Sequence, residues 1–334
     1  MHSGPKAAAI PASDRRIAAI DIARATALLA MAIYHFSWDL EFFGYLDPGT
    51  TNAGAWKVFA RCIASSFLFL VGVSLVLAHG NGIRWHGYWK RLAMVAGAAA
   101  AITLVTYLAV PQGFIFFGIL HQIALASLLG LAFLRLPWMV NALLAALVIA
   151  LPFHFRAPVF DNPALWWVGL PTEIPRSNDY VPLFPWFGAV LAGMAAAQLA
   201  SATGLRGRLA AYVPGRWARL PRFLGRHSLA VYLIHQPVLI ALVWVASQVV
   251  PAPEVTPEAG FMQACQPACE GGRDAEFCAG YCVCMLEELE NAGDLSRILA
   301  GEQDQSLTSR TREAADRCTA AQEDLGETAT EEGP

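Results

Sequence analysis

Long apolar runs separated by short polar loops occupy the first 250 residues of the chain. A helix needs roughly 20 apolar residues to cross the hydrocarbon core of a bilayer, and most of the runs are close to this length. They predict seven transmembrane helices at about residues 17–37, 58–79, 92–110, 115–134, 137–153, 183–200 and 227–250. The pattern therefore predicts an all-α polytopic membrane protein whose helices surround a polar cavity.

The composition supports a membrane protein and divides the chain in two. Of the 334 residues, 56% are hydrophobic and 15% are charged, and the mean hydropathy is +0.45, which excludes an ordinary soluble domain. Residues 1–250 contain 18 Lys and Arg and 8 acidic residues, whereas residues 251–334 contain 5 Arg and 18 acidic residues. We expect a cytoplasmic tail at 1–14, a basic membrane domain at 15–250, an acidic, cysteine-rich helical extension at 251–322 and a disordered tail at 323–334.

Lysine and arginine residues are concentrated in alternate loops, and short loops with this bias face the cytoplasm. The bias places the N-terminus in the cytoplasm, and an odd number of spans then places residues 251–334 on the outer side. The basic residues of these loops are Arg15, Arg16, Arg84, Lys90, Arg91, Arg135, Arg206, Arg208, Arg216, Arg219, Arg222 and Arg226.

The first span carries ionisable residues, which are costly inside a bilayer and therefore mark a candidate functional site. Asp21, Arg24 and His35 share one helical face, because steps of three and four residues return to the same side. Arg24 and His35 are eleven residues apart, which is about 16 Å along a helix axis. Asp39, one turn further, is placed to orient the His35 imidazole and to stabilise its charged form.

Two further histidines lie within predicted spans. His121 is in the fourth span, and His235 shares a helical face with Tyr232 in the seventh. One histidine in each of three spans favours a shared polar cavity. The alternative is that each is a satisfied polar residue that joins neighbouring helices. The spacing fits neither a metal site nor the nucleophile elbow of a serine hydrolase.

Six of the seven cysteines lie in the extension, at Cys265, Cys269, Cys278, Cys282, Cys284 and Cys318. The first four form two C-x3-C pairs, and each pair lies on one face of a helix. Two such helices in a hairpin would pair Cys265 with Cys282 and Cys269 with Cys278, and the last two cysteines would form a third bridge. This is the preferred one of 15 connectivities, and zinc binding is the competing interpretation. Disulfides need an oxidising compartment, which agrees with the outward placement of the extension.

Five segments of the chain, taken in order, resemble a known family of membrane acyltransferases. They are IDIARATALLAMAIYHFSWDL, SSFLFLVGVSL, FGILHQIALASLLGL, DYVPLFPWFGAVLAG and LGRHSLAVYLIHQPVLI. The first contains an R-x10-H motif, from Arg24 to His35. Together the segments cover most of residues 15–245 and resemble bacterial members of the heparan-alpha-glucosaminide N-acetyltransferase catalytic-domain family. Residues 251–334 lie outside the resemblance.

The resemblance implies an acyl-CoA-dependent acyltransferase of the bacterial inner (cytoplasmic) membrane. The distribution of lysine and arginine then places the extension in the periplasm. An acyl group, implied to be acetyl, would pass from cytoplasmic acetyl-CoA to an amine or hydroxyl of an envelope glycan on the outer side. The implied partners are acyl-CoA, a glycan or amino-sugar acceptor and the lipid bilayer. Neither a metal nor a nucleic acid is implied, and a homo-oligomer is compatible with it.

The resemblance also assigns roles to residues. His35 is implied as the catalytic residue, either as general base or as acyl carrier, and Arg24 as a contact to the CoA side. CoA is polyanionic, so an arginine-rich cytoplasmic surface suits it. The expected catalytic residues are His35, Asp39, His121 and His235. The expected donor-binding residues are Arg24, Asp21, Arg91, Arg226 and Tyr232.

Two other functions remain open from the sequence. Membrane histidines and an Asp–Arg pair also serve proton-coupled transporters and flippases of small anionic or lipid-linked molecules, although no internal repeat is visible here. A membrane scaffold that presents the cysteine-rich extension to a partner is the third interpretation. The acceptor, the choice between N- and O-acylation, the acyl chain and the oligomeric state are not fixed by the sequence.

Overall fold

The computed structural model describes residues 17–47, 49–80, 82–253, 256–270, 273–302 and 304–331, and the side chains up to residue 324. The chain forms two compact units. The first contains Met1–Phe36 and Asn52–Ala241, and the second contains Ser37–Thr51 and Leu242–Pro334. The expected cytoplasmic tail at 1–14 and the last residues, 332–334, lie outside the described residues.

The seven predicted spans are all helices, and the fold is 79% helical with no strand among the described residues. Five of these helices are long and apolar enough to cross a membrane: α1 (Ala18–Phe42), α2 (Gly54–His79), α3 (Trp85–Ala109), α6 (Leu183–Ala202) and α9 (Ser228–Ser247). Two shorter apolar helices are α4 (Ile119–Phe133) and α5 (Trp138–His154). The predicted all-α polytopic fold is therefore confirmed.

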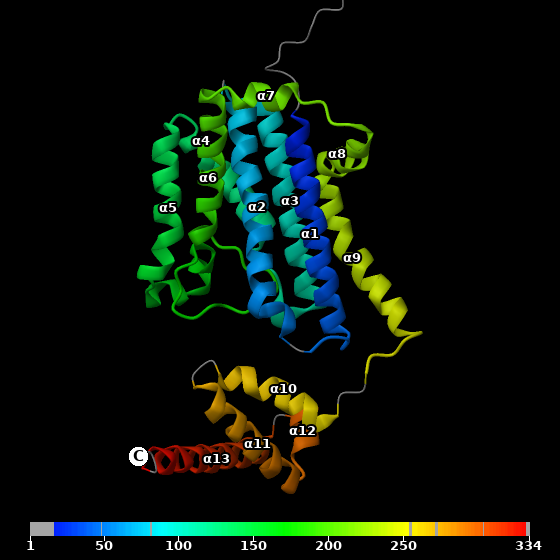
Figure 1. The fold of residues 1–334 in the computed structure, drawn as a ribbon, viewed down its shortest axis with the longest axis vertical. Helices are drawn as coiled ribbons and strands as arrows, with labels where there is room; N and C mark the ends of the chain where they lie inside the picture. Colours follow the sequence, from blue (N-terminus) through cyan, green and yellow to red (C-terminus); the bar gives the residue numbers. More distant parts are fainter. Residues whose placement is uncertain are drawn as a thin grey trace, which may run out of the picture. The chain divides into compact units, whose positions relative to one another are not determined.

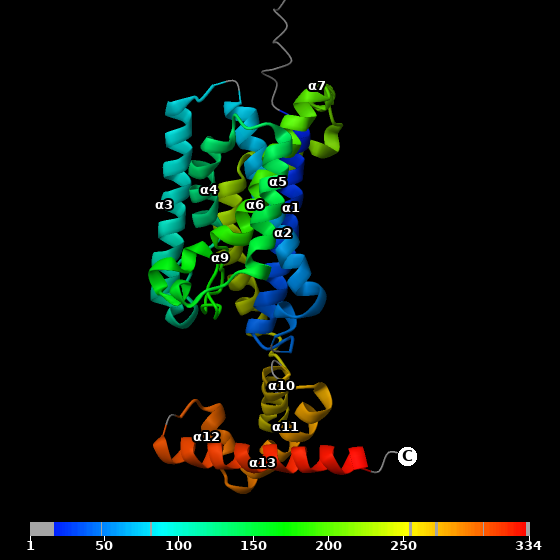
Figure 2. The same ribbon diagram turned by 90° about the vertical axis from the view of Figure 1, so that its left-hand side faces the viewer.

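The apolar helices of the first unit run side by side and alternate in direction (Figures 1 and 2). The connections that precede α3, α5 and α9 gather at one end, together with the short helices α7 (Leu205–Ala211) and α8 (Arg219–Arg226). The connections that precede α4 and α6 lie at the opposite end. The fold thus collects the arginine-rich loops at one end of the helices. Single 3-10 turns lie at Thr50–Asn52, Pro111–Gly113, Pro158–Asp161, Pro163–Val168 and Arg216–Ala218.

The core of the first unit lies where α2, α4 and α6 meet. Its most buried side chains are Leu68 on α2 and Val190, Leu191 and Met194 on α6. Glycines allow the backbones of α2 and α6 to touch, as small residues commonly do between membrane helices. A Cβ at Gly72 would lie 1.9 Å from the Val190 carbonyl oxygen, and a Cβ at Gly193 would lie 2.0 Å from that of Phe69. Both distances are too short for any side chain.

We expect Gly193→Ala to lower the free energy of unfolding by about 1–3 kcal/mol, because the added methyl group must push α6 away from α2. Thermal unfolding of the purified protein in detergent measures this effect. Gly97→Ala on α3 is the matched control, since no atom lies within 4 Å of a Cβ there. The control should be neutral or slightly stabilising. Equal melting temperatures for the two variants would contradict the close α2–α6 contact.

The second unit is a helical, disulfide-bonded extension. It contains α10 (Pro257–Cys269), α11 (Ala275–Asn291), α12 (Leu295–Leu299) and α13 (Gln305–Glu331). Thr256 and Asp274 cap the first turns of α10 and α11 through their side chains, which accept hydrogen bonds from Ala259 N and Phe277 N. The last helix, α13, runs through most of the segment that was expected to be disordered.

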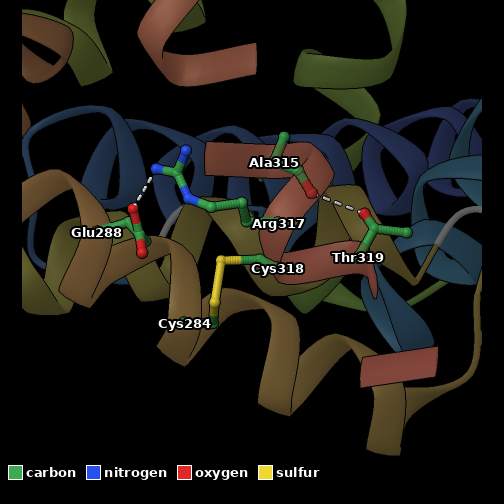
Figure 3. The surroundings of a disulfide bond; sticks show 6 residues. All are labelled: Cys284, Glu288, Ala315, Arg317, Cys318 and Thr319. Carbon is green, nitrogen blue, oxygen red and sulfur yellow. Dashed lines mark hydrogen bonds and ion pairs between the residues drawn. A yellow bond between two sulfur atoms is a disulfide. The ribbon is translucent and has the colours of Figure 1, made fainter. Parts of the chain in front are cut away.

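Three disulfides hold these helices together. Cys265–Cys282 and Cys269–Cys278 join α10 to α11, and Cys284–Cys318 joins α11 to α13 (Figure 3). The predicted connectivity is thereby confirmed. The zinc interpretation is wrong, because every cysteine that it needs is already bonded to another.

Apolar side chains surround the third bridge, and ion pairs between charged side chains lie on the same helices. Cys318 is fully buried among Met285, Leu289 and Ala314. An ion pair between Arg317 and Glu288 lies next to this bridge (Figure 3). Asp294, also buried, accepts two hydrogen bonds from one guanidinium, at 2.7 Å from Nε and 2.8 Å from Nη2 of Arg310. These hydrogen bonds hold the pKa of the Asp294 carboxyl below its usual value.

The segment after α1 belongs to the same unit. Gln263 of α10 donates a hydrogen bond to Asp47 at 2.9 Å, and the Tyr45 hydroxyl donates to the carbonyl of Val250. The Glu41 carboxylate accepts hydrogen bonds from the backbone of the loop that follows, including one of 2.8 Å from Thr51 N. Asp39, predicted to assist His35, is fully buried and lies in this second unit.

Candidate active site

Two of the three predicted membrane histidines lie together. The rings of His35 on α1 and His235 on α9 have their centroids 5.0 Å apart and are inclined by 73°. Tyr34 packs edge-on against His35, with ring centroids 5.8 Å apart. Within the described part of the chain, the ring nitrogens of His35 make no hydrogen bond.

The hydrogen bonds of His235 define its tautomer. Its Nδ1 lies 2.6 Å from the carbonyl oxygen of Tyr232, and because a carbonyl can only accept, Nδ1 is the protonated nitrogen. Nε2 is buried and has no hydrogen-bond partner among the described residues. In the neutral ring this nitrogen carries a lone pair, so His235 presents a proton acceptor next to His35.

Tyr232 lies at the centre of the helical unit. Its ring centroid is 5.7 Å from that of His235. The side chain also packs against Leu28 of α1 in one apolar cluster and against Val95 and Leu120 of α3 and α4 in another. Tyr232 was predicted to bind the donor, and the structure places it beside His235 and in the apolar cluster that contains Val95.

His121 has a different environment from the other two. Gly118 N donates a hydrogen bond to its Nδ1 at 3.1 Å, so Nε2 carries the proton and lies 3.1 Å from the Thr103 hydroxyl oxygen. Its ring also packs against Phe117. Among the described residues, no hydrogen bond or ring contact joins His121 to the histidine pair. These contacts give His121 a role in holding the start of α4.

A basic cavity of about 360 Å³ opens at the arginine-rich end of the unit. It lies between α2, α3 and α4, and the Tyr88 hydroxyl in its wall donates to the Ser127 carbonyl at 3.2 Å. The predicted residue Arg91 lines it. The lining residues are Val71, Ser74, Leu75, Ala78, His79, Arg84, Gly87, Tyr88, Arg91, Leu92, Val95 and Ser127.

The other predicted arginines form a network behind the cavity wall. Arg24 donates a hydrogen bond of 2.6 Å to the hydroxyl of Ser74, which lines the cavity, and another of 3.3 Å to Asp21. Arg226 forms an ion pair with the same carboxylate at 3.7 Å. The backbones of α8 and α1 touch here, because a Cβ at Gly225 would lie 1.8 Å from the Asp21 carbonyl oxygen. The structure thus joins Asp21, Arg24 and Arg226 next to the cavity.

A row of packed side chains connects the cavity with the histidine pair. Val95 lines the cavity and belongs to the same apolar cluster as Tyr232. Tyr232 is adjacent to His235, and His235 is adjacent to His35.

The opposite end of the unit presents a carboxylate and aromatic rings. Asp179 precedes α6 and accepts a hydrogen bond of 2.8 Å from Ile119 N, at the start of α4. Burial raises the pKa of the Asp179 carboxyl to about 6. Nearby, Phe116 packs against Trp166 and Phe117 against Trp167, with ring centroids 5.2 and 6.5 Å apart. This end of the unit thus carries a buried carboxylate and packed aromatic rings.

Several residues that line the basic cavity were not predicted from the sequence. Arg84 was visible in an arginine-rich loop but was not assigned to the site. Ser74 and Tyr88 carry no signal in the sequence, because only the fold brings these residues of α2 and α3 to one cavity.

The apolar helices define a membrane protein, and its helical unit contains a basic cavity and a pair of neighbouring histidines. Residues 16–237 match the model of the family described as heparan-alpha-glucosaminide N-acetyltransferase, catalytic. The match covers more than half of the chain, so the chain belongs to this family and is a membrane acetyltransferase. The resemblance drawn from its five segments is confirmed. No curated protein and no solved structure matches the chain.

Proposed function

We propose that the protein transfers an acetyl group from cytoplasmic acetyl-CoA to an amine or hydroxyl of an envelope glycan on the outer side of the bacterial inner membrane. The observation that carries this proposal is the row of side chains from the basic cavity through Tyr232 to His235 and His35. It gives one site an anion-binding end and a proton-accepting end.

The cavity suits the phosphate-bearing end of the donor in charge. Arg84 and Arg91 provide guanidinium groups for phosphates, which they bind in a forked geometry. A volume of about 360 Å³ lies within the range of small-molecule sites. The Arg24 network fixes Ser74 in the wall, and Arg24 is about 16 Å from His35 along α1. Acetyl-CoA, when bound, supplies the acetyl group as a reactive thioester.

The histidine pair supplies the proton transfer. His35 accepts the proton of the attacking amine or hydroxyl as the new bond to the acetyl carbon forms and the carbon–sulfur bond breaks. It then returns the proton to the departing sulfur. His235 lies beside His35, and its tautomer, held by the Tyr232 carbonyl, keeps Nε2 as a second acceptor.

The proposed orientation of the protein in the membrane rests on the arginine-rich loops and on the disulfides. The arginine-rich loops gather at one end of the helices, which supports placing that end in the cytoplasm. The three disulfides support placing the extension in the periplasm, since they persist only in an oxidising compartment. Asp179 and the aromatic rings of the loop before α6 are then on the acceptor side.

We expect Arg91→Ala to weaken acetyl-CoA binding about tenfold or more, because a hydrogen bond to a charged group contributes about 1.5–3 kcal/mol. Isothermal titration calorimetry on the purified protein in detergent gives this Kd. Arg135→Ala is the control, since it removes a cation from the same end without touching the cavity. Equal Kd values for the wild type, Arg91→Ala and Arg135→Ala would show that acetyl-CoA does not bind in this cavity. Tight binding without acetyl transfer to any glycan would favour a transporter.

A further inference from the structure

The connection between α6 and α9 combines arginine residues with large apolar side chains that are left uncovered. Residues 204–227 contain six arginines, and no acidic residue occurs in residues 180–253. In the same stretch, the side chains of Trp217, Leu220 and Phe223 are 64%, 65% and 58% exposed. A strong positive charge and an uncovered apolar surface therefore coincide in one short segment.

The helix α8 packs on the protein with one side and leaves the opposite side open. Gly225 is buried against α1, where a Cβ would lie 1.8 Å from the Asp21 carbonyl oxygen. Successive residues of a helix are about 100° apart, so Phe223 and Leu220 lie about 160° and about 140° around α8 from Gly225. The apolar side chains are thus on the side of α8 that faces away from α1.

The arginines beside this apolar side are not all neutralised by the protein. Arg219, Arg222 and Arg226 follow one another at steps of three and four residues, so they form a stripe along α8. Arg226 pairs with Asp21 of the donor-site network. Arg219 and Arg216 are exposed, and no ion pair joins either of them to a carboxylate among the described residues. Their charges are therefore open to an anionic partner outside the chain.

We propose that α8 and the turn Arg216–Ala218 before it bind the headgroups of acidic phospholipids. Trp217, Leu220 and Phe223 enter the adjoining acyl chains, and the arginines reach the phosphates. An amphipathic helix that combines basic and large apolar residues lies in the plane of a bilayer interface, and tryptophan favours the level of the headgroups.

The place of α8 in the fold supports a lipid surface as the partner. The helix lies at the arginine-rich end of the unit, beside the start of α9, where the spans end (Figure 1). A membrane surface is therefore within its reach. Acidic headgroups are favoured over neutral ones because the sequence around α8 contains no carboxylate to balance the arginines. This inference goes beyond the acetyl transfer proposed above and does not depend on it.

The test measures which lipid surrounds Trp217. The full-length protein is reconstituted into phosphatidylcholine vesicles in which about one tenth of the lipid is brominated, because bromine quenches the fluorescence of a tryptophan that it contacts. The brominated lipid is either phosphatidylglycerol, which is acidic, or phosphatidylcholine. Trp217 is one of ten tryptophans, so its signal is the difference between the wild type and Trp217→Phe.

Brominated phosphatidylglycerol should quench this signal as if it were about fivefold more abundant next to Trp217 than in the vesicle, the factor expected of one basic residue near an acidic surface. Brominated phosphatidylcholine should quench it in proportion to its abundance. The double variant Arg216→Gln/Arg219→Gln should respond equally to the two lipids. Its melting temperature should equal that of the wild type, because both side chains are exposed.

Lys90→Gln/Arg135→Gln is the matched control, because it removes two positive charges from the same end of the unit and leaves α8 unchanged. It should retain the preference for phosphatidylglycerol. Equal quenching by the two lipids in the wild type, or a preference that survives in Arg216→Gln/Arg219→Gln, would overturn the proposal. An equal loss of the preference in the control would do the same, since it would assign the effect to overall charge. A Trp217 signal that neither lipid quenches would show that this surface faces water or a protein, and would also overturn it.

Discussion

Alanine in place of His35 is expected to lower the turnover number of acetyl transfer by about 10²- to 10⁴-fold, the usual contribution of a positioned general base. The Kd of acetyl-CoA should not change, because His35 lies about 16 Å beyond Arg24 along α1 and does not line the cavity. Turnover is measured with labelled acetyl-CoA and a mixture of amine- and hydroxyl-bearing envelope glycans. The variant should elute as the wild type does in size-exclusion chromatography.

Two companion variants identify what the imidazole does. His154→Ala at the end of α5 removes a histidine with no contact to the pair and should turn over normally. His235→Ala removes the neighbouring acceptor and should also reduce turnover, since the two rings are 5.0 Å apart. Label that stays on the wild-type protein without an acceptor, and is absent from His35→Ala, would identify an acyl carrier instead of a base. Full activity in His35→Ala would refute its assignment as the catalytic residue.

Removing the bridge between α11 and α13 should have the largest effect on the stability of the extension. In the double variant Cys284→Ala/Cys318→Ala, the lost bridge spans 34 residues, and the chain-entropy model gives a loss of about 4 kcal/mol. The same model gives about 2.5 kcal/mol for Cys269→Ala/Cys278→Ala, whose bridge spans 9 residues. Limited proteolysis of the full-length protein, which reports the opening of the extension, measures both.

The control for this series is Cys62→Ala, which removes the free, exposed thiol of α2 and no bridge. Its digestion should match that of the wild type. The expected order is faster cleavage of the extension in Cys284→Ala/Cys318→Ala than in Cys269→Ala/Cys278→Ala. The reverse order, or no acceleration in either, would show that packing around Met285 and Leu289 holds α13 without the bridge.

The architecture of the membrane unit was predictable because each span is identified by its own length and hydropathy. The seven predicted segments correspond to seven helices, with ends that differ by a few residues. The largest difference at a C-terminal end is in α1, which was expected to end at residue 37 and continues to Phe42. The additional residues include Asp39, which is fully buried.

The disulfides were predictable for a similar reason. The C-x3-C spacing fixes which cysteines share a helical face, and a hairpin of two such helices then leaves one natural pairing. By contrast, α7 and α8 were not expected, because their arginines indicated a polar loop and their short length gave no span.

The donor site was predictable in charge and not in detail. Arg91 and the Asp21–Arg24–Arg226 network follow from ionisable residues at one end of apolar helices. The pairing of His35 with His235, and the separation of His121 from them, depends on how α9 packs against α1.

The pattern of the three bridges also bears on the order of events during synthesis. Cys269–Cys278 lies inside the loop closed by Cys265–Cys282, and Cys284–Cys318 begins only after both. No bridge crosses another, so no part of the chain has to be threaded through a closed loop. If the extension is exported as proposed, the α10–α11 hairpin can oxidise as soon as Cys282 has crossed the membrane, before the residues of α13 have followed.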